Sequence, residues 1–276
     1  MNKLIAMMLA VTALAASALA ATSEITVDIR LTGEDFLAGE RIRGVVDIAN
    51  SSPERVSVGY SNSKDSFFIE IFRASDMHAL TRLSAGKFVA PFRLESGEGQ
   101  KLEVFLGDHF SLREPSRYLA KPVLLHNGVR YEGLPKAFDV VNGIRIGGAM
   151  QMFANRRGLQ REFDLLYWSR NHSEHLFLAA SDAGTSDRRW ETRDLGPILR
   201  IDRPSISVMK GGEVVVLHRL DQDQFVRSEF WSLPDALEFR IREVVQDPET
   251  AGTARVRELY KEGGIKAKQN PWWKFW

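Results

Sequence analysis

The sequence EFDLLYWSRNHSEHLFLAAS, residues 162–181, decides the fold of the second half of the chain. Two apolar segments flank the short polar stretch Asn171–Glu174, which is the pattern of a β-hairpin. Successive residues of a strand point to opposite faces, and Leu165–Trp168 is apolar at every position. We therefore expect a central strand here, a polar surface turn after it, and a hairpin that forms the core of a second domain.

A second copy of this layout follows at residues 213–228, where EVVVLHR and QFVRS flank a polar turn. Aligning the two copies places Arg219 on Arg170, 49 residues earlier. This spacing is near the period of a propeller blade. We expect an antiparallel β domain over residues 144–246, built either as a sandwich or as a partial propeller.

The first 20 residues have the pattern of a cleaved signal peptide. Lys3 supplies the positive start, residues 4–14 are apolar, and Ala18 and Ala20 are the small residues that a signal peptidase recognises. No later stretch of ~18 apolar residues follows, so we expect no transmembrane segment in the mature chain. The predicted destination is the periplasm or the extracellular space.

Composition excludes several classes of function. The chain has no cysteine, which excludes disulfides, thiolate metal sites and cysteine nucleophiles. Without the predicted leader, whose only charged residue is Lys3, acidic and basic residues are equal in number. Such a balance gives no electrostatic footprint for DNA or RNA. The remaining ~250 residues suffice for one large or two ordinary domains.

Residues 21–143 show about seven short strands separated by turn signals, which is typical of an immunoglobulin-like β-sandwich. Tyr118, at the entry to the penultimate strand, resembles the tyrosine corner of immunoglobulin-like domains. The conserved cysteine pair of that family is absent, so the resemblance implies the cysteine-free type found in bacterial envelope proteins. Pro122 lies within the same strand and predicts an edge position or a bulge there.

The segment Asn142–Gly148 is the predicted domain junction. It is too short for a flexible linker, so the two domains should pack against each other. Further on, Leu178–Gly184 and Trp190 together resemble a degenerate Asp-box, the blade-turn motif of sialidase-like propellers. Ala180 replaces the expected Ser or Thr, and the aromatic residue comes late. This resemblance implies a turn at Asp182–Gly184 and a glycan-directed activity.

Three arginines are candidate ligand-binding residues: Arg170, Arg219 and Arg227. Arginine binds carboxylates in a bidentate manner, as a sialidase-like site requires. Such enzymes also need a tyrosine nucleophile with a glutamate. Tyr167 and Glu162 form the only local pair, but their odd spacing places them on opposite faces of the strand. The competing interpretation is that the arginines are structural residues at strand ends and on the surface.

His172 and His175 are weak candidates for metal ligands, with His218 as a third nitrogen donor. Their spacing in a turn is loose and no fourth ligand is apparent, so a solvated polar turn is the simpler interpretation. No dinucleotide, P-loop or metalloprotease motif occurs in the chain. We therefore expect no cofactor.

Residues 247–263 begin with Asp-Pro-Glu and predict a short helix. Residues 264–276 form a tail with several lysines and four aromatic residues in its last five positions: Trp272, Trp273, Phe275 and Trp276. Tryptophan is enriched at interfaces. The tail could cover an open end of its own β domain, dock into a partner, or adsorb to a membrane surface.

The sequence therefore predicts an all-β protein, exported and non-catalytic, that serves as a binding or scaffolding module of the cell envelope. The expected partner is an envelope protein or a glycan. The alternative is a glycan-directed lectin or a degenerate sialidase-like hydrolase, for which the three arginines would form the site. A proteinase-inhibitor-like role for the first domain rests on fold analogy alone.

Overall fold

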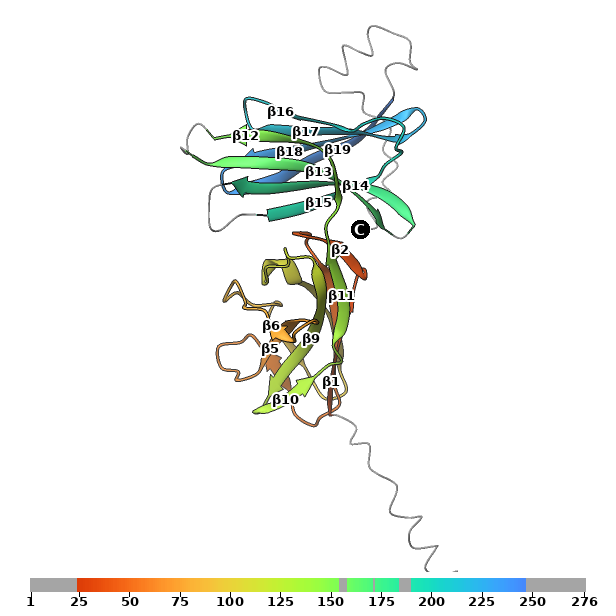
Figure 1. The fold of residues 1–276 in the computed structure, drawn as a ribbon. Coiled ribbons are helices and arrows are strands. Elements are labelled where there is room, and N and C mark those ends of the chain that lie inside the picture. Colours follow the sequence, from red (N-terminus) through yellow and green to blue (C-terminus); the bar gives the residue numbers. More distant parts are fainter. Residues whose placement is uncertain (1–23, 154–157, 171, 184–189, 247–276) are drawn as a thin grey trace, which may run out of the picture.

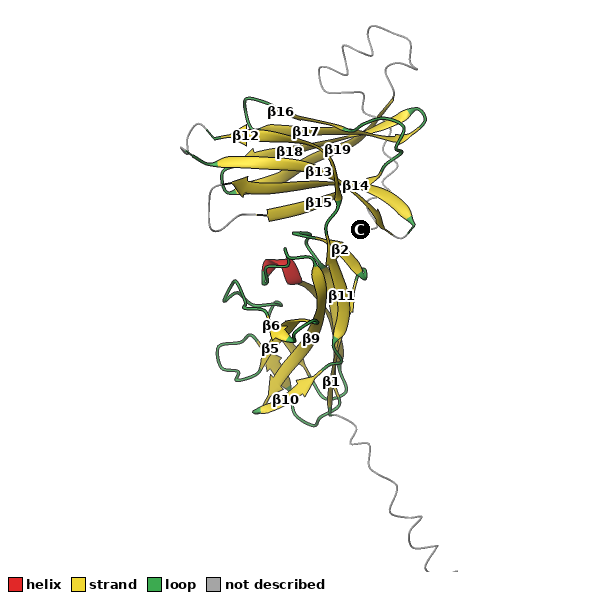
Figure 2. Ribbon diagram, viewed as in Figure 1, coloured by secondary structure: helices red, strands yellow, loops and turns green. Residues whose placement is uncertain are grey.

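The computed structural model describes residues 24–153, 158–170, 172–183 and 190–246. These residues form an all-β protein of two domains that are stacked end to end (Figures 1 and 2). One short 3₁₀ turn, Leu106–Asp108, interrupts the strands of the first domain. Among the described residues, no helix is long and apolar enough to cross a membrane. The predicted signal peptide, helix 247–263 and tail 264–276 lie outside the described residues.

The first domain contains eleven strands around one core. A three-stranded sheet has the order β1-β3-β8, a larger sheet has the order β2-β11-β9-β5-β6 with β10 beside β9, and β4 pairs with β7. The strand bounds are β1 (Ile25–Leu31), β2 (Asp35–Leu37), β3 (Arg43–Asn50), β4 (Val56–Val58), β5 (Ser66–Arg73), β6 (His78–Ala79), β7 (Phe92–Leu94), β8 (Gly99–Phe105), β9 (Ser116–His126), β10 (Val129–Glu132) and β11 (Lys136–Val141).

The core of this domain lies between its sheets. In β1, β3 and β5, buried apolar residues alternate with more exposed ones, because each of these strands has one face on the core. The buried sets share a single hydrophobic cluster that includes Ile29, Val46, Ile71, Tyr118 and Phe138. The hydroxyl of Tyr118 donates a hydrogen bond of 2.9 Å to the carbonyl oxygen of Glu114. This contact back to the preceding backbone has the geometry of a tyrosine corner, and the immunoglobulin-like assignment stays a prediction.

The edge position predicted for Pro122 is wrong, because β9 is central in its sheet. Its neighbour on one side changes from β11, which pairs up to Ala120, to β10, which pairs from Val123. Pro122 lies at this change, and its carbonyl oxygen accepts a hydrogen bond from the amide of Gly133. A proline has no amide hydrogen to donate to a ladder. It is tolerated in a central strand here because the neighbouring strand is interrupted beside it.

The second domain consists of two four-stranded antiparallel meanders, β12-β13-β14-β15 and β16-β17-β18-β19. The strand bounds are β12 (Ile144–Met152), β13 (Gln160–Arg170), β14 (Ser173–Ala183), β15 (Trp190–Pro197), β16 (Ser205–Val208), β17 (Glu213–Asp221), β18 (Gln224–Leu233) and β19 (Ala236–Gln246). The two meanders face each other over one hydrophobic cluster.

Both predicted hairpins are present, and each joins the second and third strands of its meander. In β13, Phe163, Leu165 and Tyr167 are buried, and the residues between them are partly buried. The strand is therefore central and covered on both faces, as its sequence predicts. Two local predictions fail. Residues 144–148 belong to β12 rather than to a junction, and Asp182 lies within β14 rather than in a turn.

Candidate functional site

The two domains meet where the connection between β2 and β3 packs on the outer face of β14 and β15. The amide of Thr192 donates to the carbonyl oxygen of Gly39 over 2.9 Å, and its hydroxyl donates to that of Ala38 over 2.7 Å. Phe177 and Ala179 also belong to this outer face, yet both are almost fully buried. The predicted packing between the domains is therefore present, and it involves main-chain hydrogen bonds.

A bidentate ion pair joins the domains beside these hydrogen bonds. The guanidinium group of Arg170 lies 2.8 and 2.6 Å from the two carboxylate oxygens of Glu40. The amide of Leu37 also donates a hydrogen bond to the carboxylate of Glu40, so the turn that contains Glu40 helps to orient this side chain towards Arg170. Burial alone would lower the pKa of Arg170, but its hydrogen bonds with Glu40 outweigh that effect and raise it. Arg170 is therefore a fixed cation at the junction.

Asp194 extends this ion pair into a network. One oxygen of its carboxylate lies 3.5 Å from the guanidinium group of Arg170. The carboxylate also lies 3.0 Å from Nδ1 of His175. A β-bulge in β15 positions it: Gly196 has φ +92°, and its amide donates to the Asp194 carboxylate over 2.7 Å. Burial raises the pKa of Asp194, but the hydrogen bond and charge of His175 outweigh this, and the pKa lies below its ordinary value.

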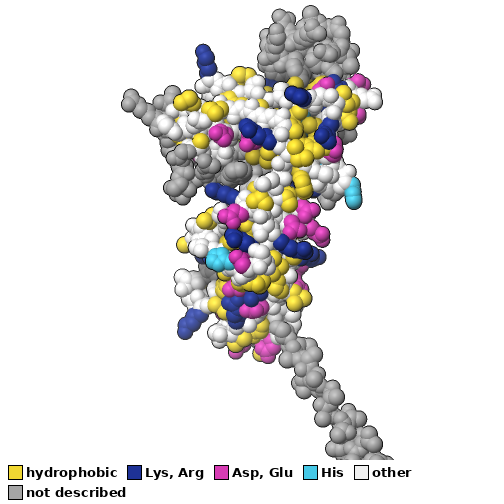
Figure 3. All heavy atoms as spheres, viewed as in Figure 1, with side chains coloured by type: hydrophobic (Ala, Val, Ile, Leu, Met, Phe, Trp, Pro, Cys, Tyr) yellow, Lys and Arg dark blue, Asp and Glu magenta, His cyan; other side chains and the backbone are white. Residues whose placement is uncertain are grey.

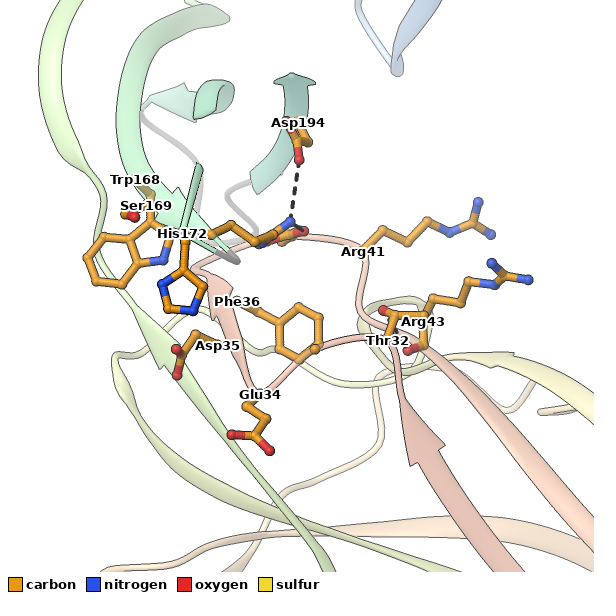
Figure 4. A pocket seen from close by; sticks show the side chains of 13 residues that line it. Thr32, Glu34, Asp35, Phe36, Arg41, Arg43, Trp168, Ser169, His172 and Asp194 are labelled. Atoms are coloured by element: carbon orange, nitrogen blue, oxygen red, sulfur yellow. Dashed lines mark hydrogen bonds and ion pairs between the residues drawn. The ribbon is translucent and has the colours of Figure 1, made fainter. Parts of the chain in front are cut away.

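A cleft of about 800 Å³ opens beside this network, with walls from both domains (Figure 4). The first domain contributes Glu34, Asp35 and Phe36 to it, and the β13–β14 hairpin contributes Trp168, Ser169 and His172. Figure 3 shows acidic and basic side chains close together at the narrow waist between the domains. The cleft is therefore lined by both charged and apolar groups, including the aromatic side chains of Phe36 and Trp168.

The charged groups of the cleft fall into two sets. Arg41 lies 2.9 Å from Asp108, and Arg43 is paired with Glu103, so these two cations are already neutralised. The side chains of Glu34 and Asp35 are exposed, and within the described part of the chain they form neither a hydrogen bond nor an ion pair. Glu34 and Asp35 are therefore the carboxylates of the cleft without a hydrogen-bonded partner, and the charge of Asp35 contributes to the raised pKa of Arg170.

Trp168 is the least satisfied polar group of the cleft. Its indole nitrogen is shielded from solvent and has no acceptor among the described residues. Residue 172 follows it in the turn with φ +63°, a left-handed conformation, and its imidazole lies beside the indole in Figure 4. A buried donor without an acceptor is costly.

The three candidate arginines do not share a site. Arg170 lines the cleft and forms a salt bridge with Glu40. Arg219 lies 2.6 Å from Asp202, and Arg227 is paired with Glu229 on the outer face of the other meander. Binding of a ligand by these residues stays a prediction, but a shared carboxylate-binding cluster is not what their positions offer.

The histidines are separated in the same way. His175 contacts Asp194, whereas His218 is buried inside the domain with its Nε2 3.2 Å from the carbonyl oxygen of Pro197. Across the described ranges, no group of three His, Cys, Asp or Glu side chains is placed to hold a metal ion. Burial and the nearby charge of Arg242 lower the pKa of His218 to about 3, so this imidazole is neutral.

Tyr167 and Glu162 lie on opposite faces of β13, as expected from their spacing. Tyr167 is buried on the inner face, and its hydroxyl accepts a hydrogen bond of 3.0 Å from Arg200. Burial raises its pKa further above the ordinary value. Tyr167 therefore does not pair with Glu162, and a hydrogen bond with Glu174 also raises its pKa.

The most buried charged side chain among the described residues, Arg161, was not one of the predicted site residues. Arg161 is 0% exposed, and its guanidinium contacts Asp182 over 2.6 and 3.2 Å. It also donates to the carbonyl oxygens of Leu233, Pro234 and Ala236 in the β18–β19 turn. A signal was present, because alternation places Arg161 on the same face of β13 as the buried residues that follow it.

The tail residues Trp272, Trp273, Phe275 and Trp276 lie outside the described residues, so their predicted contact with a partner stays a prediction. The same is true of the export signal.

Comparison with known proteins assigns no family. No family model and no curated protein match the chain. Spo0M, a sporulation control protein from Bacillus subtilis, is 11% identical, with 87% of this chain and 97% of that chain covered, at a TM-score of 0.31.

Two further solved structures are similar over smaller shares of their length. The alkylpurine DNA glycosylase AlkC from Pseudomonas fluorescens, solved with DNA containing an abasic-site analog, is 18% identical, with 42% of this chain and 30% of that chain covered, at a TM-score of 0.30. The cycloalternan-forming enzyme from Listeria monocytogenes, solved with a pentasaccharide substrate, is 14% identical, with 79% and 18% covered, at a TM-score of 0.25. All three TM-scores are too low to carry an argument about fold or function.

Proposed function

We propose that this protein is an exported, non-catalytic binding module of the cell envelope, and that its ligand binds in the cleft between the domains. The observation that carries the proposal is the cleft itself, which both domains line and which the Arg170–Glu40 ion pair holds in one geometry. Ligand sites are commonly found at domain interfaces. The location in the envelope rests on the signal-peptide pattern of residues 1–20.

The chemistry of the cleft supports binding rather than catalysis. A general acid or base needs a free group poised near the operating pH. The least exposed ionisable groups of this region already form ion pairs: Glu40 pairs with Arg170, and Asp194 pairs with His175. The free carboxylates, Glu34 and Asp35, are exposed to solvent. Fixed ion pairs of this kind stiffen a binding site, which lowers the entropic cost of association.

The immunoglobulin-like assignment of the first domain belongs to this proposal. It is supported by the sheets around one core and by the tyrosine-corner contact of Tyr118. Domains of this type serve mainly in recognition, although fold analogy alone does not establish function.

The proposal can be tested by crosslinking in cells that make the protein. A photoreactive amino acid placed at Ser169, which is exposed in the cleft, should form adducts with the ligand. The same group at Ser61, an exposed residue of the first domain that does not line the cleft, is the matched control. Adducts that are specific to position 169 and reduced by Asp35→Asn would support the cleft. Equal adducts at both positions, or none at 169, would contradict it.

A glycan-binding protein is the second candidate, and Trp168 favours it. Sugars stack on exposed aromatic rings, and carboxylates beside the ring accept their hydroxyl hydrogens. On a glycan array, Trp168→Ala should abolish binding of any oligosaccharide that the parent retains. Trp231→Ala, which changes a tryptophan of β18 that does not line the cleft, should leave binding unchanged. An array without any bound glycan would leave a protein ligand as the remaining class.

A further inference from the structure

The cleft and the C-terminal tail have complementary chemistry. Glu34 and Asp35 line the cleft with exposed carboxylates, and the imidazole of His172 lies between Asp35 and Trp168 in Figure 4. Residues 265–276 contain three lysines, no acidic residue and four aromatic residues. A lysine ammonium group is attracted both to carboxylates and to the face of a tryptophan ring. We propose that the cleft binds residues 264–276 of the protein's own chain.

The main chain of the cleft also suits a peptide. β2 is the last strand of its sheet in the described part of the chain, and Asp35 and Phe36 of this strand line the cleft. An edge strand presents unpaired amide and carbonyl groups, to which an extended segment can add.

The chain leaves the second domain at the end where the cleft lies. Gln246, the last residue of β19, pairs with Gln224 next to the β17–β18 turn. The amide of Leu199 donates to the carbonyl oxygen of Arg219 in β17, and the neighbouring amide of Ile198 donates to that of Glu174. Glu174 lies two residues after His172, which lines the cleft. These contacts connect the end of β19 to the rim of the cleft.

The intervening chain is long enough to span this distance. Residues 247–263 lie between Gln246 and the tail. A segment of this length spans roughly 55 Å when extended and roughly 25 Å as a helix. A domain of about 100 residues is roughly 35 Å across. The tail can therefore reach the cleft without crossing the whole molecule.

This inference rests on the proposed function and deepens it, because a tail bound in the cleft would compete with any external ligand. A tethered segment has an effective concentration on the order of 1 mM. If the tail binds with a dissociation constant of about 0.1 mM, the cleft is occupied about nine-tenths of the time. An external ligand would then bind about tenfold more weakly to the intact chain than to a chain with an altered tail.

The absence of cysteine allows a direct test on the full chain. In the Ser169→Cys variant, the new thiol lies in the cleft, and its rate of alkylation by a maleimide reports access. We expect alkylation about tenfold slower with the natural tail than with Lys266→Glu, Lys268→Glu and Lys274→Glu together. The replacement of Glu34 by Gln and Asp35 by Asn should release the thiol to the same extent. Ser61→Cys is the control, and its rate should not depend on the tail.

A second measurement tests whether the tail itself, rather than a change elsewhere in the variant, blocks access to the thiol. A synthetic peptide of residues 264–276, added to the tail variant, should protect the thiol at position 169 in a saturable way. Equal alkylation rates at position 169 in both backgrounds would overturn the inference, as would failure of the peptide to protect. Crosslinking of an external ligand at position 169 would then still support the proposed function, so the two failures are distinguishable.

Discussion

The two ends of strand β13 each carry an arginine. One arginine makes contacts within the second domain, and the other makes contacts between the domains. Arg161, near the start, is fully buried. It connects the two meanders of its own domain through hydrogen bonds with Asp182 in β14 and with the β18–β19 turn. Arg170, at the end, is partly exposed and joins two domains through Glu40. Their spacing of nine residues places them on opposite faces of the strand. We therefore expect Arg161 to contribute mainly to the stability of the second domain, and Arg170 to the contact between the domains.

The largest effect is expected at the enclosed end. Arg161→Met should lower the free energy of unfolding by about 3–5 kcal/mol, because Asp182 would remain buried without a counterion. The turn carbonyls of Leu233 and Pro234 would also lose their donor. Urea unfolding followed by tryptophan fluorescence measures this change.

Two variants sharpen that result. Arg145→Met removes an exposed arginine of β12 that pairs with Asp164, and it should cost less than about 1 kcal/mol. Combining Arg161→Met with Asp182→Leu should recover part of the loss, because no charge is then left buried. A single Arg161→Met variant as stable as the parent would show that the enclosed ion pair is not needed for the fold.

His218, which is buried inside the second domain, should make the stability of the protein depend on pH. His218 has a pKa of about 3 in the folded state and about 6.5 when unfolded. Below about pH 6.5 the unfolded chain binds a proton that the native state does not, so stability falls as the pH decreases towards 3. The loss is about 1.4 kcal/mol per pH unit, or about 2 kcal/mol between pH 6.5 and pH 5.

Urea unfolding at pH 7 and pH 5 measures this dependence. His218→Gln should remove most of the slope, because glutamine does not titrate. His78→Gln, a change of an exposed histidine in the first domain, is the control and should keep the parent slope. An unchanged slope in His218→Gln would mean that the imidazole is charged inside the domain.

The sequence predicted the strands and hairpins of the second domain better than it predicted the contacts between the domains. Periodicity located both hairpins and the burial of β13 on both faces, because alternation depends only on local geometry. It missed β2, a strand of three residues, since so short a segment has no period. The domain contact depends on β2 and on the bulge at Gly196, and neither follows from the residues around it.

The candidate site was predicted only in part, for the same reason. Arg170 and His172 do line the cleft, but Glu34 and Asp35 are more than 120 residues away in sequence. Nothing in the pattern TGEDF predicts that it will line the same cleft as Trp168. The pairing of Arg170 with Glu40 likewise depends on tertiary contact, so the sequence could indicate an arginine but not its role.

A smaller effect is expected from the ion pair across the junction. In a double-mutant cycle of Arg170→Met and Glu40→Gln, the coupling free energy should be about 1–2 kcal/mol, because the pair is bidentate but partly solvated. Each variant should also loosen the contact between the domains, and small-angle X-ray scattering would detect this as a larger radius of gyration. A coupling near zero with unchanged scattering would leave the Thr192 hydrogen bonds as the main link.

The smallest effect is expected for Arg219, which occupies in the second meander the position that Arg170 occupies in the first. It contacts Asp202, a partly exposed residue of its own domain, rather than the other domain. Arg219→Met should therefore cost less than about 1 kcal/mol and leave the scattering curve unchanged. If it altered the domain arrangement as Arg170→Met does, the two hairpins would share a role as well as a shape. Equivalent positions in a repeat need not keep equivalent functions: in the described part of the chain, Arg170 pairs with the first domain and Arg219 pairs within its own domain.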